Sequence, residues 1–328
     1  MLRKFYSLMA LAAIAGGVTV LAGNAGATVF TWNGTNSSDP TVASNWSNPA
    51  PVIGGANNGT GNSYSAADNV TVSGTAHPLD YTAVDGTTSF DGQFEISLGA
   101  VLNISGGTFT DADATNSGAL IGQVSSGTLN VSGGNFNISD NQVILGNVNN
   151  PDVGTINLSG GTITANTTAG AAGVVLGNAG NGGPGTGVLT ITGGVFKITA
   201  GGTTIGNNAG GQTGSGTLTF GLGSGVFEQT ASSSLTIGTK GVINFLSGSR
   251  GELSLNQVTS RSYFDNLVTA GQITLNGATA TPSDFAFTTT GSGTAEQGIY
   301  TLVPELATLG LMGIGMAGLL LLKRRRTA

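Results

Sequence analysis

The sequence predicts an all-β protein whose centre is a parallel β-helix, a coil of short strands stacked turn upon turn. Three observations lead to this prediction. A phrase of alternating apolar and polar residues returns several times in the middle of the chain. Each copy contains glycine, which makes up 57 of the 328 residues. Only 8% of the residues are charged, so Thr, Ser and Asn must supply much of the polar surface. An antiparallel β-sandwich is the alternative fold.

The repeated phrase first reads Leu-Asn-Ile-Ser-Gly-Gly-Thr-Phe. Its copies occupy residues 102–109, 129–136, 156–163, 189–196 and, in degenerate form, 218–227. The second glycine of each intact pair is Gly107, Gly134, Gly161 or Gly194, which gives periods of 27, 27 and 33 residues. A shorter phrase, Leu or Ile followed by Gly and in three of its five copies by Asn, lies between the copies. Repeats of this length are typical of solenoids, in which each unit buries its apolar face against its neighbours.

Each copy has a simple physical interpretation. The alternation in Leu-Asn-Ile-Ser is the period of a half-buried strand. The glycine pair permits the backbone angles of a corner. Equivalent strands are then expected to pair about 4.8 Å apart, with Leu and Ile columns inside and Asn and Thr ladders outside. The inserts Asn149–Val153 and Ala179–Thr186 fall between strand phrases, where loops do not interrupt the stack.

We place the repeats at residues 99–248. The segments before and after them are predicted to be targeting signals and caps. Residues 1–27 resemble a secretory signal peptide that is cleaved after Ala25-Gly26-Ala27, with a short N-terminal membrane helix as the alternative. Residues 28–98 are expected to form an N-terminal β cap in which Trp32 and Trp46 pack over the first coil; stacking of either on a sugar ring is the other interpretation. Residues 249–302 are expected to form a C-terminal β cap with strands at 252–255 and 272–275.

The last 26 residues, 303–328, have three parts. Val303-Pro304-Glu305 comes first, followed by the apolar segment 306–322, which at 17 residues is near the lower limit for a transmembrane helix. Lys323, Arg324, Arg325 and Arg326 then form a basic tail that favours retention in the cytoplasm. A plain C-terminal membrane anchor has the same pattern.

This order of Pro-Glu motif, apolar helix and basic cluster resembles the PEP-CTERM sorting signal of Gram-negative bacteria. The resemblance implies an exosortase in the inner membrane that cuts near the motif and passes the protein to the cell surface. The family usually has a second proline after the glutamate, where this chain has Leu306. The repeats also resemble a glycine-rich repeat of autotransporter passenger regions and PEP-CTERM exported proteins, best matched by Thr204-Ile205-Gly206-Asn207 with Gly216-Thr217-Leu218-Thr219.

The acidic net charge and the scarcity of reactive side chains argue against several classes of function. Residues 28–303 contain four basic and 15 acidic residues, a net charge of 4 − 15 = −11, so a nucleic-acid partner is not expected. The chain has no cysteine and a single histidine, His77, and it lacks a Gly-x-Ser-x-Gly nucleophile motif. We therefore expect no catalytic residues and no cofactor. Asp111 and Asp113 are the calcium candidates, because carboxylate oxygens are preferred calcium ligands.

Together these features predict an exported structural or adhesive protein of the cell surface or extracellular matrix. The expected partners are an exosortase-type enzyme, the membrane through residues 306–322, and exopolysaccharide. Two alternatives are a carbohydrate-binding surface protein and a polysaccharide-degrading β-helix enzyme.

Overall fold

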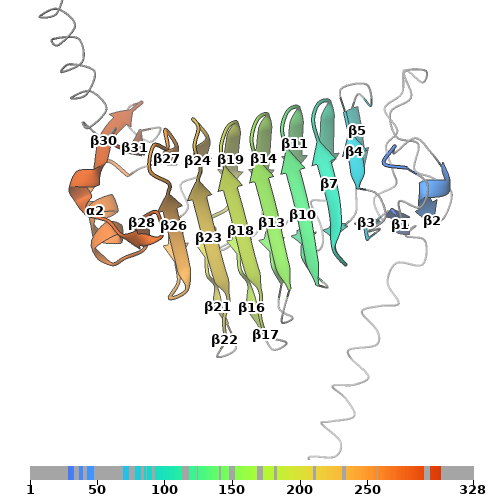
Figure 1. Ribbon diagram of the computed structural model, residues 1–328, viewed down its shortest axis with the longest axis horizontal. Coiled ribbons are helices and arrows are strands. Elements are labelled where there is room, and N and C mark those ends of the chain that lie inside the picture. The colour runs from blue at the N-terminus through green and yellow to red at the C-terminus, as the bar shows by residue number, and fades with distance from the viewer. Residues whose placement is uncertain are drawn as a thin grey trace, which may run out of the picture.

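The computed structural model is a solenoid whose strands lie side by side along its length (Figure 1). It describes residues 29–303 except 33–36, 40–42, 48–68, 74–77, 83–84, 86, 91–92, 113–117, 124, 140–141, 148–151, 168–172, 181–182, 210–211, 231–233, 257 and 292–295. Within these described residues the strands form three nine-stranded sheets, which we call A, B and C.

Each sheet runs the length of the solenoid, from one edge strand to the other. Sheet A contains β2 (Trp46–Ser47), β1 (Val29–Trp32), β3 (Asn69–Val72), β6 (Phe94–Ile96), β9 (Ala119–Ile121), β12 (Val143–Leu145), β15 (Val174–Leu176), β20 (Thr203–Ile205) and β25 (Leu235–Ile237). Sheet B contains β5 (Thr87–Phe90), β8 (Thr108–Asp111), β11 (Asn135–Ile138), β14 (Thr162–Asn166), β19 (Val195–Ala200), β24 (Val226–Gln229), β27 (Glu252–Asn256), β31 (Gln297–Leu302) and β30 (Phe285–Thr290). Sheet C contains β4 (Leu79–Tyr81), β7 (Ala100–Ile104), β10 (Ser126–Val131), β13 (Val153–Leu158), β18 (Thr186–Ile191), β23 (Ser215–Phe220), β26 (Gly241–Phe245), β28 (Ile273–Leu275) and β29 (Ala278–Thr279).

Each turn of the solenoid runs through one strand of sheet C, one of sheet B and one of sheet A. The described chain contains six such turns, β4–β6, β7–β9, β10–β12, β13–β15, β18–β20 and β23–β25. Successive turns pair in parallel and in register, so that Leu129 lies between Leu102 and Ile156. The predicted parallel β-helix is therefore confirmed, and the antiparallel sandwich is wrong.

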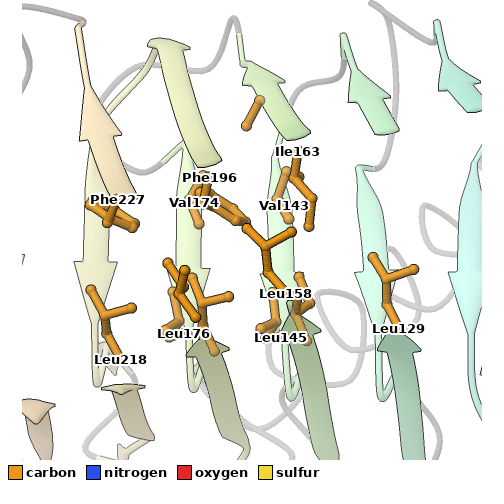
Figure 2. Close-up of a cluster of buried hydrophobic side chains, with 14 of the residues drawn as sticks. Leu129, Val143, Leu145, Leu158, Ile163, Val174, Leu176, Phe196, Leu218 and Phe227 are labelled. Carbon is orange, nitrogen blue, oxygen red and sulfur yellow. The ribbon is translucent and has the colours of Figure 1, made fainter. Parts of the chain in front are cut away.

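The predicted apolar columns fill the interior (Figure 2). Inward residues such as Leu129, Leu158 and Phe196 have at most 1% of their surface exposed, and they belong to one continuous core. Phe196 and Phe227 occupy the same position in successive turns of sheet B and stack with ring centroids 5.7 Å apart. Burial of each side chain of this size contributes roughly 1.5–3 kcal/mol, and the neighbouring turns supply the surfaces that achieve it.

Glycine forms the corners because the turns approach too closely for a side chain. Gly134, the second glycine of its pair, has a φ of +68°, in the left-handed region. A Cβ atom at this position would lie 2.5 Å from the backbone carbon of Gly106 in the preceding turn. Both the backbone angle and the space at this corner therefore require glycine.

The first full turn, β4–β6, lies in the segment that we assigned to the N-terminal cap. Its corner after β4 has no glycine pair. Asp85 forms it instead, because one of its carboxylate oxygens accepts hydrogen bonds from the backbone N–H of Thr82 at 2.6 Å and from the hydroxyl of Thr82 at 2.8 Å. The sequence pattern missed this turn because a side-chain hydrogen bond replaces the glycines.

The N-terminal strands continue sheet A beyond this first turn. Strand β1 pairs in parallel with β3 and antiparallel with β2, which follows the short 3₁₀ helix η1 (Ala43–Asn45). The side chain of Trp32 is fully buried in the core, in line with the packing role that we expected. Trp46 is paired through its backbone with Trp32, and its side chain lies outside the described part.

The C-terminal end closes each sheet differently. Sheet C ends in the antiparallel hairpin β28–β29, and sheet B ends in the antiparallel strands β31 and β30. Strand β25 of sheet A is followed in space by the helix α2 (Arg261–Thr269): the hydroxyl of Tyr263 donates to the carbonyl of Leu235, and Gln272 donates to the carbonyl of Ile237. These contacts satisfy carbonyl groups of an edge strand, which otherwise promotes association between chains.

The strands predicted at 252–255 and 272–275 are observed as β27 and β28, but helix α2 between them was not predicted. It is short, with nine residues, and several of them are aromatic or β-branched, which have modest helix propensity. The N-cap Ser260, whose side chain accepts from the N–H of Ser262, and the buried pair Phe264 and Val268 stabilise it. Packing on the end of the core therefore decides its conformation.

The insert Ala179–Thr186 contains a hairpin, β16 (Ala179–Gly180) and β17 (Gly183–Pro184), and the next turn carries a similar one, β21 (Asn208–Ala209) and β22 (Gln212–Thr213). Both hairpins project from the corner between sheets A and C, and the register of the stacked strands is not shifted by them. The 3₁₀ helix η3 (Pro282–Asp284) precedes β30. No helix among the described residues is long and apolar enough to cross a membrane, and the predicted helix at 306–322 lies outside them.

Candidate functional site: the outer face of sheet C

The strands of sheet C lie side by side along the solenoid (Figure 1). Their outward residues form a regular array of small polar and β-branched side chains. Inward and outward residues alternate along each strand. One outward column contains Val101, Thr128, Thr155, Val188, Thr217 and Val242. The next contains Asn103, Asn130, Asn157, Thr190, Thr219 and Asn244. None of the strand residues from β7 to β28 in this sheet is charged.

A ladder of amide side chains orders the N-terminal part of this face. The amide nitrogen of Asn157 donates to Asn130 at 2.9 Å, and that of Asn130 donates to Asn103 at 2.8 Å. Asn103 in turn donates to the carboxylate of Asp80 at 2.6 Å. In each of these hydrogen bonds the donor lies one turn C-terminal to its acceptor, and the negatively charged carboxylate of Asp80 accepts the last bond. The bonds in this row are therefore aligned and polarise one another favourably. The predicted outer Asn ladder is confirmed.

A second ladder follows the glycine corner between sheets A and C. Asn207 donates to Asn178 at 2.7 Å, and Asn178 donates to Asn147 at 3.1 Å. Gln123 occupies the equivalent position one turn earlier, because Ile121 pairs with Leu145. The side-chain oxygen of Gln123 is buried and has no hydrogen-bond partner. Glutamine has one methylene more than the asparagines of the ladder, so its oxygen lies one bond farther from the backbone than theirs.

The outer face of sheet B, in contrast, carries charge in its C-terminal half. Lys197 lies 3.4 Å from a carboxylate oxygen of Glu228, which also accepts a hydrogen bond from Gln297 at 3.4 Å. Burial and the negative charge of Glu228 both raise the pKa of Glu252 on the next strand. The sequence did not reveal this group, because its members are 24 or more residues apart and only the strand register brings them together.

One of the two calcium candidates, Asp111, lies in a buried strand position. Asp111 is the last residue of β8, fully buried, and in register with Ile138 of the next turn. Asp113 lies outside the described residues. Among the residues that the structure describes, no group of three or more His, Cys, Asp or Glu side chains could hold a metal ion.

Of the remaining predicted residues, the structure describes Trp32 and Val303. Trp32 is fully buried, so the sugar-stacking interpretation is wrong for this residue. Val303 is exposed, and its N–H donates to the carbonyl of Asp284, so the described fold continues up to the first residue of the predicted sorting motif. The other positions fall outside the described part of the chain; they are Ala25, Ala27, His77, Pro304, Glu305, Lys323, Arg324, Arg325 and Arg326.

Comparison with known proteins adds no relative, because the chain matches no protein-family model, no curated protein and no solved structure. The site must therefore be interpreted from its own chemistry. Hydroxyl and amide groups donate and accept hydrogen bonds without changing their charge at ordinary pH. A regular array of them is suited to holding a polar partner over many positions.

Proposed function

We propose that this protein is an exported structural or adhesive protein of the cell surface or extracellular matrix. The observation that carries the proposal is the solenoid itself, a rod of six full turns with repeated polar side chains on its outside. A stack of this kind provides an extended and rigid surface from a small repeated unit. Such a surface suits spacing, adhesion or matrix assembly.

The two ends of the sequence support export. Residues 1–27 have the features of a signal peptide, and residues 303–328 resemble a PEP-CTERM sorting signal. In this proposal the helix at 306–322 anchors the precursor, the tail Lys323–Arg326 stays in the cytoplasm, and an exosortase cuts near Pro304-Glu305. The last strand ends at Leu302, so the cut would release the folded solenoid with few additional residues.

The test is the intact mass of the protein recovered from the surface and from the membrane of producing cells. We expect a membrane precursor that contains Lys323–Arg326 and a surface form that ends near the motif. A variant with Pro304→Ala and Glu305→Gln should accumulate as precursor, whereas Thr327→Ala, beyond the basic cluster, should be processed normally. Recovery of only full-length chains from the surface would contradict processing at this motif, and absence of the protein from the surface would contradict the proposed function.

A further inference from the structure

The outer face of sheet C is uncharged over most of its length, although the protein as a whole is acidic. Residues 28–303 have a net charge of −11, yet no strand residue of this sheet from β7 to β28 is charged. We infer that this face binds an uncharged, hydroxyl-rich polysaccharide chain across several turns. The inference rests on the proposed function, because it identifies the partner of the surface that the exported rod presents.

The polar groups of this face are held in position before any partner arrives. The hydrogen bonds between Asn103, Asn130 and Asn157 fix the orientation of three amides in successive turns. Each amide has two donors and two acceptor positions, and the ladder uses at most one donor and one acceptor of each, so further positions are available to a ligand. Binding therefore orders little of the protein, which lowers its entropic cost.

The chemistry of the face selects a neutral polymer over other partners. An anionic chain would need basic residues, and the strands of this face from β7 to β28 contain none. Its outward columns contain no aromatic residue, so contacts consist of hydrogen bonds and methyl packing without ring stacking. Each such contact is weak, but a ligand with a repeating unit engages many turns at once, and this multiplies the affinity.

The other two faces have shorter stretches of this kind. Sheet B has uncharged polar outward residues on β8, β11 and β14 only, because Lys197, Glu228 and Glu252 lie on the outer side of its C-terminal half. The central strands of sheet A have only three residues, and their outward side chains Leu120, Ile144 and Val175 are apolar and almost completely covered. Sheet C, with six-residue strands in four successive turns, presents the longest continuous polar face.

The test is affinity electrophoresis of the full chain in mild detergent, in native gels that contain hydroxyethyl cellulose, dextran or alginate. We expect at least one of the two neutral polymers to retard the protein, with no change in retardation when salt is added, because neutral contacts are not screened. Alginate should not retard it.

The variant Thr128→Glu/Thr217→Glu places two charges on this face without touching the ladder, and it should weaken the apparent affinity about tenfold because each carboxylate displaces ligand contacts and stays hydrated. The control Thr110→Glu/Thr164→Glu places the same charges on outward positions of sheet B and should bind like the wild type. Circular dichroism of all variants verifies that they are folded.

Three results would overturn the inference: no retardation by either neutral polymer, equal loss of binding in both double variants, or self-association of the rod that only Thr128→Glu/Thr217→Glu abolishes. The last result would assign the face to a second copy of this chain. None of these results affects export and tail processing, which the mass measurement tests separately.

Discussion

The middle turns and the C-terminal cap both cover the apolar side and the strand edges of the turn before them, but they do so by different means. In the middle, each turn covers the apolar side and the open edges of the preceding turn with an equivalent turn, so residues such as Leu129 and Ile156 pack against copies of themselves. At the end no further copy follows. Unique contacts replace it, including Tyr263 and Gln272 bonded to the carbonyl groups of β25.

This difference indicates which substitutions each of the two regions tolerates. A repeated turn is confined by the turns on both sides, so its corners have no spare room. The cap has one neighbour. It packs on the end of the core through side chains such as Phe264, and a few polar bonds that occur once tie its parts together. We therefore expect steric changes to be most harmful in the middle, and loss of single hydrogen bonds to be felt most in the cap.

The largest contrast is expected between two left-handed glycines. Gly134→Ala adds a Cβ atom 2.5 Å from backbone of the adjacent turn, whereas Gly271 in the cap, with a φ of +72°, has no atom within 4 Å of that position. The free energy of unfolding should fall by about 3–5 kcal/mol for Gly134→Ala, from clash and strain together, and by only about 1–2 kcal/mol for Gly271→Ala, from strain. Urea unfolding measures both. Equal losses would mean that the corners are not sterically confined.

The next effect concerns the polar contacts of the cap. Arg261 bonds to Asp265 and donates to the carbonyl groups of Pro282 and Phe285, which ties α2 to η3 and β30. Arg261→Ala should lower the unfolding free energy by about 1–2 kcal/mol, reduced from the value for buried charged bonds because the side chain is partly exposed. Arg261→Lys should recover little, since lysine lacks the planar fork. If hydrogen exchange in α2 is unchanged in Arg261→Ala, this residue does not hold the cap.

A smaller effect is expected from the ladders. Asn130→Ala removes a bond to Asn103 and one from Asn157, and should destabilise the protein by about 1 kcal/mol. Gln123→Asn should do the opposite, because the shorter side chain brings an oxygen into line with Asn147 and adds a rung worth about 0.5–1 kcal/mol. Thermal unfolding of the two variants measures both signs. A destabilised Gln123→Asn would contradict the proposed alignment.

The smallest effect is a pH dependence from Glu252. Its pKa in the folded protein is raised above the ordinary value of 4.5, so between pH 4.5 and the raised value the folded state binds more protons than the unfolded state. Stability should therefore decrease as the pH rises through this window. Glu252→Gln should remove this decrease and stabilise the protein by less than about 1 kcal/mol at pH 7. Unfolding at pH 4 and pH 7 gives the comparison, and an unchanged pH dependence in Glu252→Gln would assign it to another group.

Sequence patterns predicted the middle of the molecule well because its interactions repeat. The phrases at Leu102 and Leu129 gave the strands, the register and the inward columns, and the Asn residues within them gave the outer ladder. Features that occur only once in the chain could not be predicted from the repeat pattern. The Asp85 corner of the first turn and the helix with Phe264 both depend on side chains that occur once.

The candidate site was predicted less completely, because it depends on which turns become neighbours. The uncharged face of sheet C follows only from adding outward residues over several strands. The contrasting charge on sheet B likewise depends on the pairing of Lys197 with Glu228, which are 31 residues apart in the chain. The inserts vary in length between turns, so spacing in the sequence does not give that pairing directly.

The central claim is that each turn is stabilised by its neighbours and is otherwise interchangeable. Deleting residues 126–152 removes one complete turn, because Val153 pairs with Ser126 at the equivalent position. Urea unfolding, followed by circular dichroism, should show that this shortened chain keeps its β structure and a cooperative transition at a lower midpoint, whereas deletion of residues 126–138, which breaks the register, prevents folding. Loss of folded structure in the whole-turn deletion to the same extent as in the partial deletion would contradict the account.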